Sequence, residues 1–131
     1  MRDFRGLKVW EKAHQLTLDV YRATRSFPDE ERFGLTSQMR RSAASIPSNI
    51  AEACGRGGDL EFGRFMRIAM GSASEVEYQF LLAHDLGLLT SESHDALLVQ
   101  VTEVKRMLSA LIVRSRGNGR SPATRPLTAE G

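Results

Sequence analysis

The feature that most constrains this chain is a proline inside a segment that otherwise has the pattern of a helix. The segment runs from Gln38 to Glu52 and reads QMRRSAASIPSNIAE, with Pro47 near its middle. Proline in a helix interior removes one backbone hydrogen bond and crowds the carbonyl group four residues earlier, at a cost of about 3 kcal/mol. A chain with proline at this place therefore needs neighbouring groups that satisfy the freed carbonyl.

Apolar residues continue through the proline at spacings of three and four. They are Leu35, Met39, Ala43, Ile46, Ile50 and Ala53. This continuity predicts one helix from about Asp29 to Ala53, kinked at Pro47, rather than two separate helices. The acidic residues at 29–31 would occupy its first turn, where the helix dipole favours them, and the sequence GRGG at 55–58 would end it.

Three further segments have the same apolar spacing and predict helices over about 6–25, 59–86 and 91–116. Asp59 is the expected N-cap of the second of these, and Gly87 is placed to end it. The apolar stripes are Val9, Ala13, Leu16, Val20 and Ala23; Phe62, Phe65, Ala69, Ala73, Val76, Phe80 and Ala83; and Leu97, Val101, Val104, Leu108 and Leu111. No alternation typical of strands is sustained, so we predict an all-α, up-down-up-down four-helix bundle.

Length and composition place the chain in one domain. The predicted bundle covers residues 1–116, and the Gly-, Pro-, Ser- and Thr-rich residues 117–131 predict a disordered basic tail. Cys54 is the only cysteine, which fits a reducing compartment. No apolar run reaches the roughly 20 residues that span a bilayer, and the first residues lack the pattern of a signal peptide. We therefore expect a cytoplasmic protein without membrane association.

The sequence does not favour an enzyme. Glu11 and His14 have the Glu-x-x-His spacing of di-metal bundles, but His84 and His94 have no glutamate three residues before them, so the ligand set is incomplete. No Gly-x-Ser-x-Gly elbow is present, and Cys54 has no evident histidine partner. We expect no catalytic residue, no metal site and no cofactor.

Basic residues are unevenly distributed, and fifteen of the eighteen are arginine. Residues 68–104 contain six acidic residues and no Lys or Arg, whereas residues 105–125 contain six basic residues and no acidic one. Such clusters either form a solvated surface or contact an anionic partner such as RNA or DNA. The candidate contacts are Arg40, Arg41, Arg56, Arg64, Arg67, Lys105, Arg106, Arg114 and Arg116.

A second set of polar residues surrounds the proline. Small residues at 71–74 predict a close approach of the third helix to the second, with Ser45 or Asn49 bonding the freed carbonyl. The expected cluster comprises Ser45, Pro47, Asn49, Glu52, Gly71, Ser72 and Glu75. It can specify packing without any chemistry, and we interpret it as structural.

Three stretches carry a resemblance to a known family: FRGLKVWEKA, GLTSQMRRSAASIPSNIAEACGR and FGRFMRIAMGSASEVEYQFLLAHDLGLL. They resemble the four-helix-bundle proteins encoded in intervening sequences of bacterial 23S rRNA genes, from about Phe4 to Arg114. The resemblance implies a homopentamer with a central channel. It also implies a relation to the accessory proteins of diversity-generating retroelements, which contact reverse transcriptase and nucleic acid through basic surfaces. The chain departs at Ala53 and Cys54, where the family usually has Glu followed by Gly.

Two hypotheses for function follow. In the first, a non-enzymatic homo-oligomer binds RNA or DNA through arginine-rich surfaces without sequence-specific readout, since no helix-turn-helix or RNA-stacking motif is present. In the second, a pentameric scaffold binds a protein partner, and Arg40 and Arg41 pair across subunits with acids such as Glu52 or Glu75.

Overall fold

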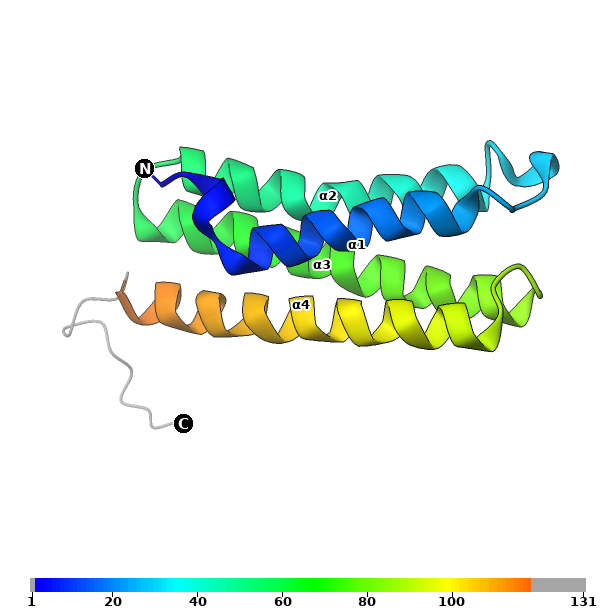
Figure 1. Ribbon diagram of the computed structural model, residues 1–131. Coiled ribbons are helices and arrows are strands. Elements are labelled where there is room, and N and C mark those ends of the chain that lie inside the picture. The colour runs from blue at the N-terminus through cyan, green and yellow to red at the C-terminus, as the bar shows by residue number, and fades with distance from the viewer. Residues whose placement is uncertain (1, 119–131) are drawn as a thin grey trace.

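The computed structural model describes residues 2–118, with side chains as far as Ser115. Four α-helices follow one another: α1 (Lys8–Thr24), α2 (Leu35–Gly55), α3 (Asp59–Asp85) and α4 (Ser91–Asn118). They lie side by side and alternate in direction, which confirms the predicted all-α four-helix bundle (Figure 1). Residues 117 and 118, the first two of the predicted tail at 117–131, are part of α4, which corrects that boundary, and residues 119–131 lie outside the described residues.

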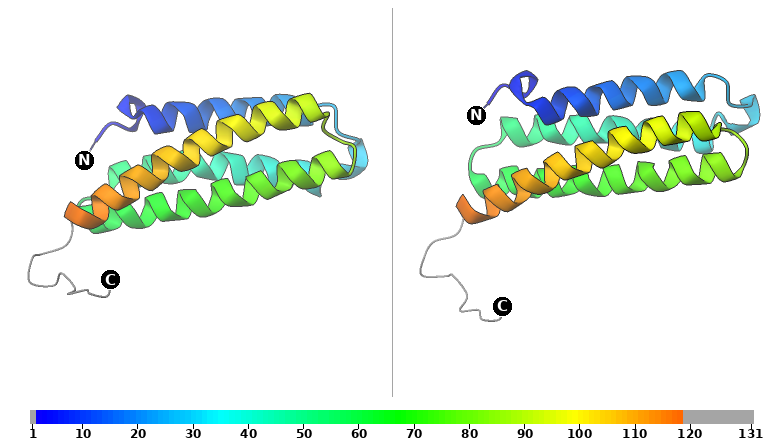
Figure 2. Two further views of the ribbon diagram at one scale, coloured as in Figure 1. Left: turned by 90° about the horizontal axis from the view of Figure 1, so that it is seen from below. Right: turned by 60° about the horizontal axis from the view of Figure 1, so that its bottom comes forward.

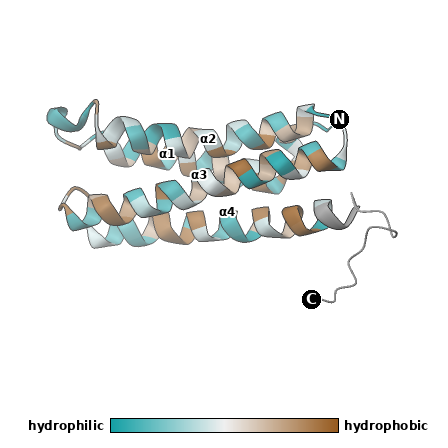
Figure 3. Cartoon of the chain, turned by 180° about the vertical axis from the view of Figure 1, so that it is seen from behind, coloured by the Kyte–Doolittle hydropathy of each residue, from teal (hydrophilic) through white to brown (hydrophobic). Residues whose placement is uncertain are grey.

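The helices do not all pack equally closely. α2 packs against α3 along its length, whereas α4 runs obliquely, near α1 where it begins and over α3 where it ends (Figure 2). Apolar residues recur at intervals along each helix between hydrophilic ones, which gives each helix one face toward the core (Figure 3).

The predicted apolar stripes form this core, except that one predicted residue of α1 and one of α4 are only partly buried. Every stripe residue of α2 and α3 is buried, whereas Ala23 of α1 is only partly buried. In α4, Leu111 is also partly buried and Ile112 takes its place, followed by buried Ser115. A strict heptad drifts about 20° per repeat against a straight helix of 3.6 residues per turn, so over two repeats the last stripe position has turned by about 40° away from the first.

Pro47 is buried inside α2, which continues as one helix on both sides of it. The bond that proline cannot make would have gone to the carbonyl of Ala43, four residues earlier. The single hydroxyl proton of Thr17, on α1, is shared between this carbonyl, at 3.1 Å, and the carbonyl of Ala13, at 2.9 Å. A side chain from another helix therefore replaces the missing bond in part.

The prediction that Ser45 or Asn49 would satisfy this carbonyl is wrong. The Asn49 amide instead donates to the Ser45 carbonyl and hydroxyl, over 2.8 and 3.0 Å. Ser45 meets Ser72 of α3, hydroxyl to hydroxyl, at 2.8 Å. The Asn49 bonds stay within α2, whereas the Ser45–Ser72 contact joins α2 to α3.

Two helix starts also differ from the prediction. Asp29–Glu31 forms a separate 3₁₀ turn, η2, and α2 begins only after Gly34, where the Glu31 carboxylate accepts from the Leu35 amide over 3.3 Å. The cap of α3 is Gly58, at φ 88°, a conformation that side chains disfavour, so Asp59 becomes the first helical residue. The end of α3 is as predicted, with Gly87 at φ 79°.

The predicted approach of residues 71–74 to α2 is made by Ser72, at the Ser45 contact, and not by Gly71. Gly71 is exposed, and a Cβ there would meet no neighbouring atom within 4 Å. A Cβ at Gly63 would lie 2.6 Å from the hydroxyl oxygen of Ser115, which donates to the Asp59 carbonyl over 2.6 Å. Gly63 therefore lets the end of α4 pack against the start of α3.

Thr17→Val should lower the free energy of unfolding by about 1–3 kcal/mol, because the Ala43 carbonyl loses its donor while buried. In a Pro47→Ala background the new alanine's amide restores the helical bond, so the same substitution should cost much less. Urea unfolding of the four proteins measures the coupling, with the exposed Thr102→Val as control. Equal losses in both backgrounds would contradict the pairing.

Gly63→Ala and Gly71→Ala form a matched pair of substitutions in one helix. The first should destabilise by about 1–3 kcal/mol, because its methyl group overlaps the Ser115 hydroxyl. The second should stabilise by about 0.5–1 kcal/mol, since alanine has the better helix propensity and space is open there. Thermal unfolding compares them, and Ser115→Ala should rescue part of the loss only for Gly63→Ala.

Candidate nucleic-acid interface

The predicted contact residues fall in separate parts of the bundle. Arg40 and Arg56 are sixteen residues apart in sequence, or about 24 Å along a helix axis. Arg40 and Arg41 lie beside the end of α1, whereas Arg56, Arg64 and the neighbouring Arg67 lie around the α2–α3 turn. The structure therefore does not bring the candidates together on one surface.

Arg40 is held by the last turn of α1. Its Nε donates to the Thr24 hydroxyl over 2.8 Å, and one terminal nitrogen donates to the Tyr21 carbonyl over 3.3 Å. The guanidinium also lies 4.7 Å from the centre of the Tyr21 ring. The final carbonyls of a helix have no partner within it, so Arg40 completes the end of α1. Its role is at least partly structural.

Arg41, the next residue, is exposed and makes a single side-chain bond, from a terminal nitrogen to the Ser37 hydroxyl over 3.2 Å. A neutral hydroxyl leaves the charge uncompensated. The side chain lines a polar pocket of about 370 Å³ between α2 and α3, together with Gln38, Ser42, Ser45, Ser72 and Glu75. Of the seven members of the predicted polar cluster, three share this pocket: Ser45, Ser72 and Glu75.

The arginines at the α2–α3 turn are mostly compensated. Arg56 pairs with Glu52 at 2.9 Å, and Arg64 pairs with Glu61 at 3.3 Å. Both guanidiniums lie over the ring of Phe65, 5.0 and 4.5 Å from its centre. Glu52 thus serves its own helix, as an i,i+4 partner. Exposed pairs of this kind contribute little stability, so a phosphate could compete for either arginine.

The chain start adds a residue that sequence reasoning missed. The guanidinium of Arg2 lies 4.1 Å from the centre of the Phe62 ring, and its backbone amide donates to the Cys54 carbonyl over 3.1 Å. These contacts bring the first residues onto the α2–α3 turn. The RDFRG sequence at 2–6, with arginines on both sides of an aromatic residue, was the available signal.

On α4, two of the basic candidates have carboxylate partners and a third has none among the described residues. Lys105 bridges to Glu77 of α3 at 2.9 Å, and Arg106 pairs with Glu103 through bonds of 2.7 and 3.0 Å. The bond from Arg106, more than the charge of Lys12, holds the pKa of Glu103 below its ordinary value. Arg114 is exposed near the end of the helix, and the side chain of Arg116 lies outside the described residues.

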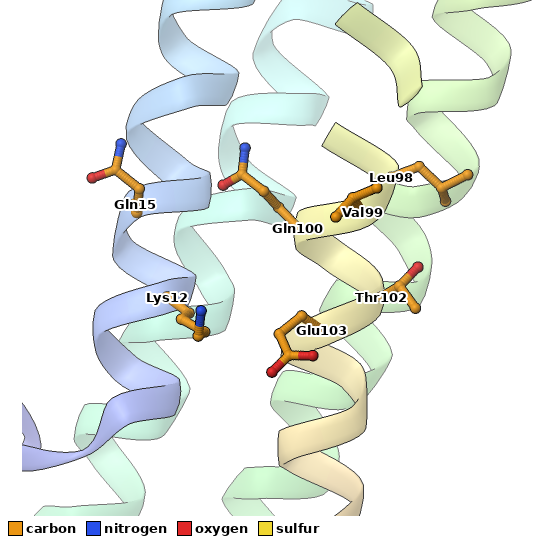
Figure 4. A pocket seen from close by; sticks show the side chains of 7 residues that line it. All are labelled: Lys12, Gln15, Leu98, Val99, Gln100, Thr102 and Glu103. Atoms are coloured by element: carbon orange, nitrogen blue, oxygen red, sulfur yellow. The ribbon is translucent and has the colours of Figure 1, made fainter. Parts of the chain in front are cut away.

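A groove between α1 and α4 is the largest pocket described, at about 690 Å³ (Figure 4). Lys12 and Gln15 line it from α1, and residues 98–100, 102 and 103 line it from α4. Across the same helix pair, the Gln100 amide donates to the Asp19 carboxylate over 3.0 Å. Sequence reasoning missed this groove because its walls are more than 80 positions apart.

In the described part of the chain, no set of three or more His, Cys, Asp and Glu side chains could hold a metal ion. His14 stacks on Trp10, with ring centres 4.9 Å apart. Across residues 2–118, none of the helices is apolar over a length that could cross a bilayer.

Comparison with known proteins gives a matching family and solved structures of similar fold. The family model described as 23S rRNA-intervening sequence protein matches residues 5–110. A crystal structure of a protein of unknown function from the S23 ribosomal protein family of Bacteroides thetaiotaomicron is similar, with a TM-score of 0.72 and 25% identity. The match covers 79% of this chain and 97% of that one. No curated protein matches the chain.

Cys54 is almost fully buried, at 1% exposure. Burial raises the pKa of its thiol, and the positive charge of nearby Arg2 only partly opposes this. A raised pKa keeps the Cys54 thiol protonated in the folded protein at pH values where the same thiol has begun to ionise in the unfolded chain. The buried thiol therefore stabilises the fold most at neutral pH.

Cys54→Ala should cost less stability at pH 9.5 than at pH 7. The stabilisation from the protonated thiol is complete below the ordinary thiol pKa of about 8.5 and is lost as pH rises through the folded value. Urea unfolding of both proteins at the two pH values measures the difference. If the difference in free energy of unfolding between wild type and variant grows from pH 7 to pH 9.5, the raised pKa of the Cys54 thiol is contradicted.

Proposed function

Because this chain belongs to the 23S rRNA-intervening sequence protein family, we propose that it is a non-enzymatic, homo-oligomeric helical bundle that binds RNA or DNA. The partner would be bound through arginine contacts to phosphate, without readout of sequence. The family resemblance supports a pentamer and a relation to the accessory proteins of diversity-generating retroelements. A cytoplasmic location belongs to the same proposal.

The observation that carries the proposal is the presence of arginines whose charge is not already compensated. Arg41 bonds only a serine, and Arg67 and Arg114 are exposed and pair with no carboxylate among the described residues. A guanidinium offers five donors in a rigid fork that matches phosphate oxygens. These three arginines are the strongest candidates for phosphate contacts, ahead of those with carboxylate partners.

A second candidate is an oligomeric scaffold for a protein partner. Large apolar side chains at several outer positions favour it, among them Leu60 at 72% exposure and Val99 at 70%. Tyr78 and Val113 are also exposed, on α3 and α4. Contacts between protein chains are typically made where such side chains form a contiguous apolar surface. In either function the bundle supplies surfaces rather than catalysis.

The proposed function predicts binding that depends on the uncompensated arginines. A triple variant, Arg41→Gln with Arg67→Gln and Arg114→Gln, should bind a labelled 20-mer at least about tenfold more weakly at low salt, with a shallower salt dependence because phosphate contacts are lost. Fluorescence anisotropy at several salt concentrations measures both. The matched control removes three arginines that already have carboxylate partners, Arg5, Arg22 and Arg106.

Equal losses in the two triple variants would mean that only net charge matters. If wild type binds neither RNA nor DNA at low salt, the nucleic-acid proposal fails. The scaffold then remains, and sedimentation of Arg41→Glu tests whether this residue pairs between subunits. Arg41 is preferred to Arg40 for that test because Arg40 also holds the end of α1.

A further inference from the structure

A pocket at the junction of α1 and α2 has properties that the proposed function does not use. It measures about 640 Å³, within the usual range for small-ligand sites. It lies beside the first turns of α2, at the end of the bundle where η2 joins the two helices (Figure 1). The lining residues are Tyr21, Arg32, Phe33, Thr36, Ser37, Arg40, Arg41, Ala44, Ser45 and Ser48.

Three guanidinium groups make this pocket positive. Arg40 is fixed in place by two bonds to α1, which leave three of its five donors unused. Arg41 uses one donor, on Ser37. Arg32 pairs with Asp29 only across an exposed contact of 3.4 Å, which is weak in water. None of the described residues that line the pocket is acidic, so no negatively charged side chain of the lining would repel an anion there.

The pocket also has an aromatic wall. Phe33 is 88% exposed, the most exposed of the large apolar side chains in the described chain. The Arg32 guanidinium lies 5.5 Å from the centre of its ring. Aromatic rings and arginine planes are the surfaces on which unpaired bases stack. An exposed phenylalanine beside three arginines therefore suits a ligand with both a flat ring and a phosphate.

One polar atom of the lining has no partner. Thr36 is 8% exposed, and its hydroxyl bonds to nothing among the described residues. A buried hydroxyl without a hydrogen bond costs stability. Thr36 lines the pocket, but its hydroxyl oxygen is itself buried, so the charge of the arginines and the aromatic ring are the groups that the site presents to a ligand.

We propose that this pocket binds one nucleoside phosphate unit, with the phosphate on Arg40 and Arg41 and the base on Phe33. The inference rests on the proposed function in that the unit would belong to a bound single strand. A base inside a duplex is stacked on both sides and cannot reach the ring, so the pocket favours single strands. The adjoining pocket contains Glu75, which disfavours a second phosphate beyond Arg41.

Phe33→Ala should weaken binding of a labelled single-stranded decamer about fivefold or more, while a duplex of equal length should change less than twofold. Leu60→Ala is the control, since Leu60 is also highly exposed but lies on α3, outside the pocket. Arg41→Gln should also weaken the single strand more than Arg22→Gln does. The site would be overturned if Phe33→Ala weakened binding of single strand and duplex equally. It would also be overturned if Phe33→Ala and Arg41→Gln weakened binding no more than their controls do.

Phe33→Trp provides a direct readout of stacking in the full chain. Adenosine monophosphate should quench the introduced tryptophan more than inorganic phosphate does, relative to wild type with its own Trp10. If wild type binds no nucleic acid but this quenching occurs, the pocket is a site for a free nucleotide and the proposed function fails. If decamers bind but neither Phe33 substitution responds, the proposed function stands and the pocket is excluded.

Discussion

The bond from the Thr17 hydroxyl to the Ala43 carbonyl is the constraint on which the bundle depends. Pro47 leaves α2 one bond short at a buried position, and only a second helix brings the replacement donor. The interior of α2 is therefore complete only when α1 is docked. The proline that looks like a helix breaker in the sequence thus makes the stability of α2 depend on its packing against α1.

Much of the fold could be predicted from apolar spacing, and the failures have a common cause. The stripes of α2 and α3 are buried as expected, because burial follows from the period of the helix itself. The donor to Ala43 and the close approach at Gly63 could not be predicted, since each depends on which residue of another helix lies opposite. Periodicity gives the face of a helix but not its axial alignment with a neighbour.

The candidate site illustrates the same limit for charge. Sequence reasoning found arginines in abundance, but pairing decides which of them are available. Arg56 and Arg106 have carboxylates one helical turn away on their own helices, a relation that the sequence does contain. Arg40 is engaged by backbone and hydroxyl groups of α1, which no local pattern indicates. The basic surface that remains for a partner is smaller than the arginine count implies.

The contact at Gly63 also fixes where α4 stops along α3. Helices with repeating apolar stripes can slide past each other by one turn, about 5.4 Å, and still bury similar surface. Only one alignment places Ser115 over the residue that lacks a side chain, with its hydroxyl on the Asp59 carbonyl. The pair acts as an axial stop, so the sequence selects one register from several that hydrophobic burial alone would leave nearly equal in energy.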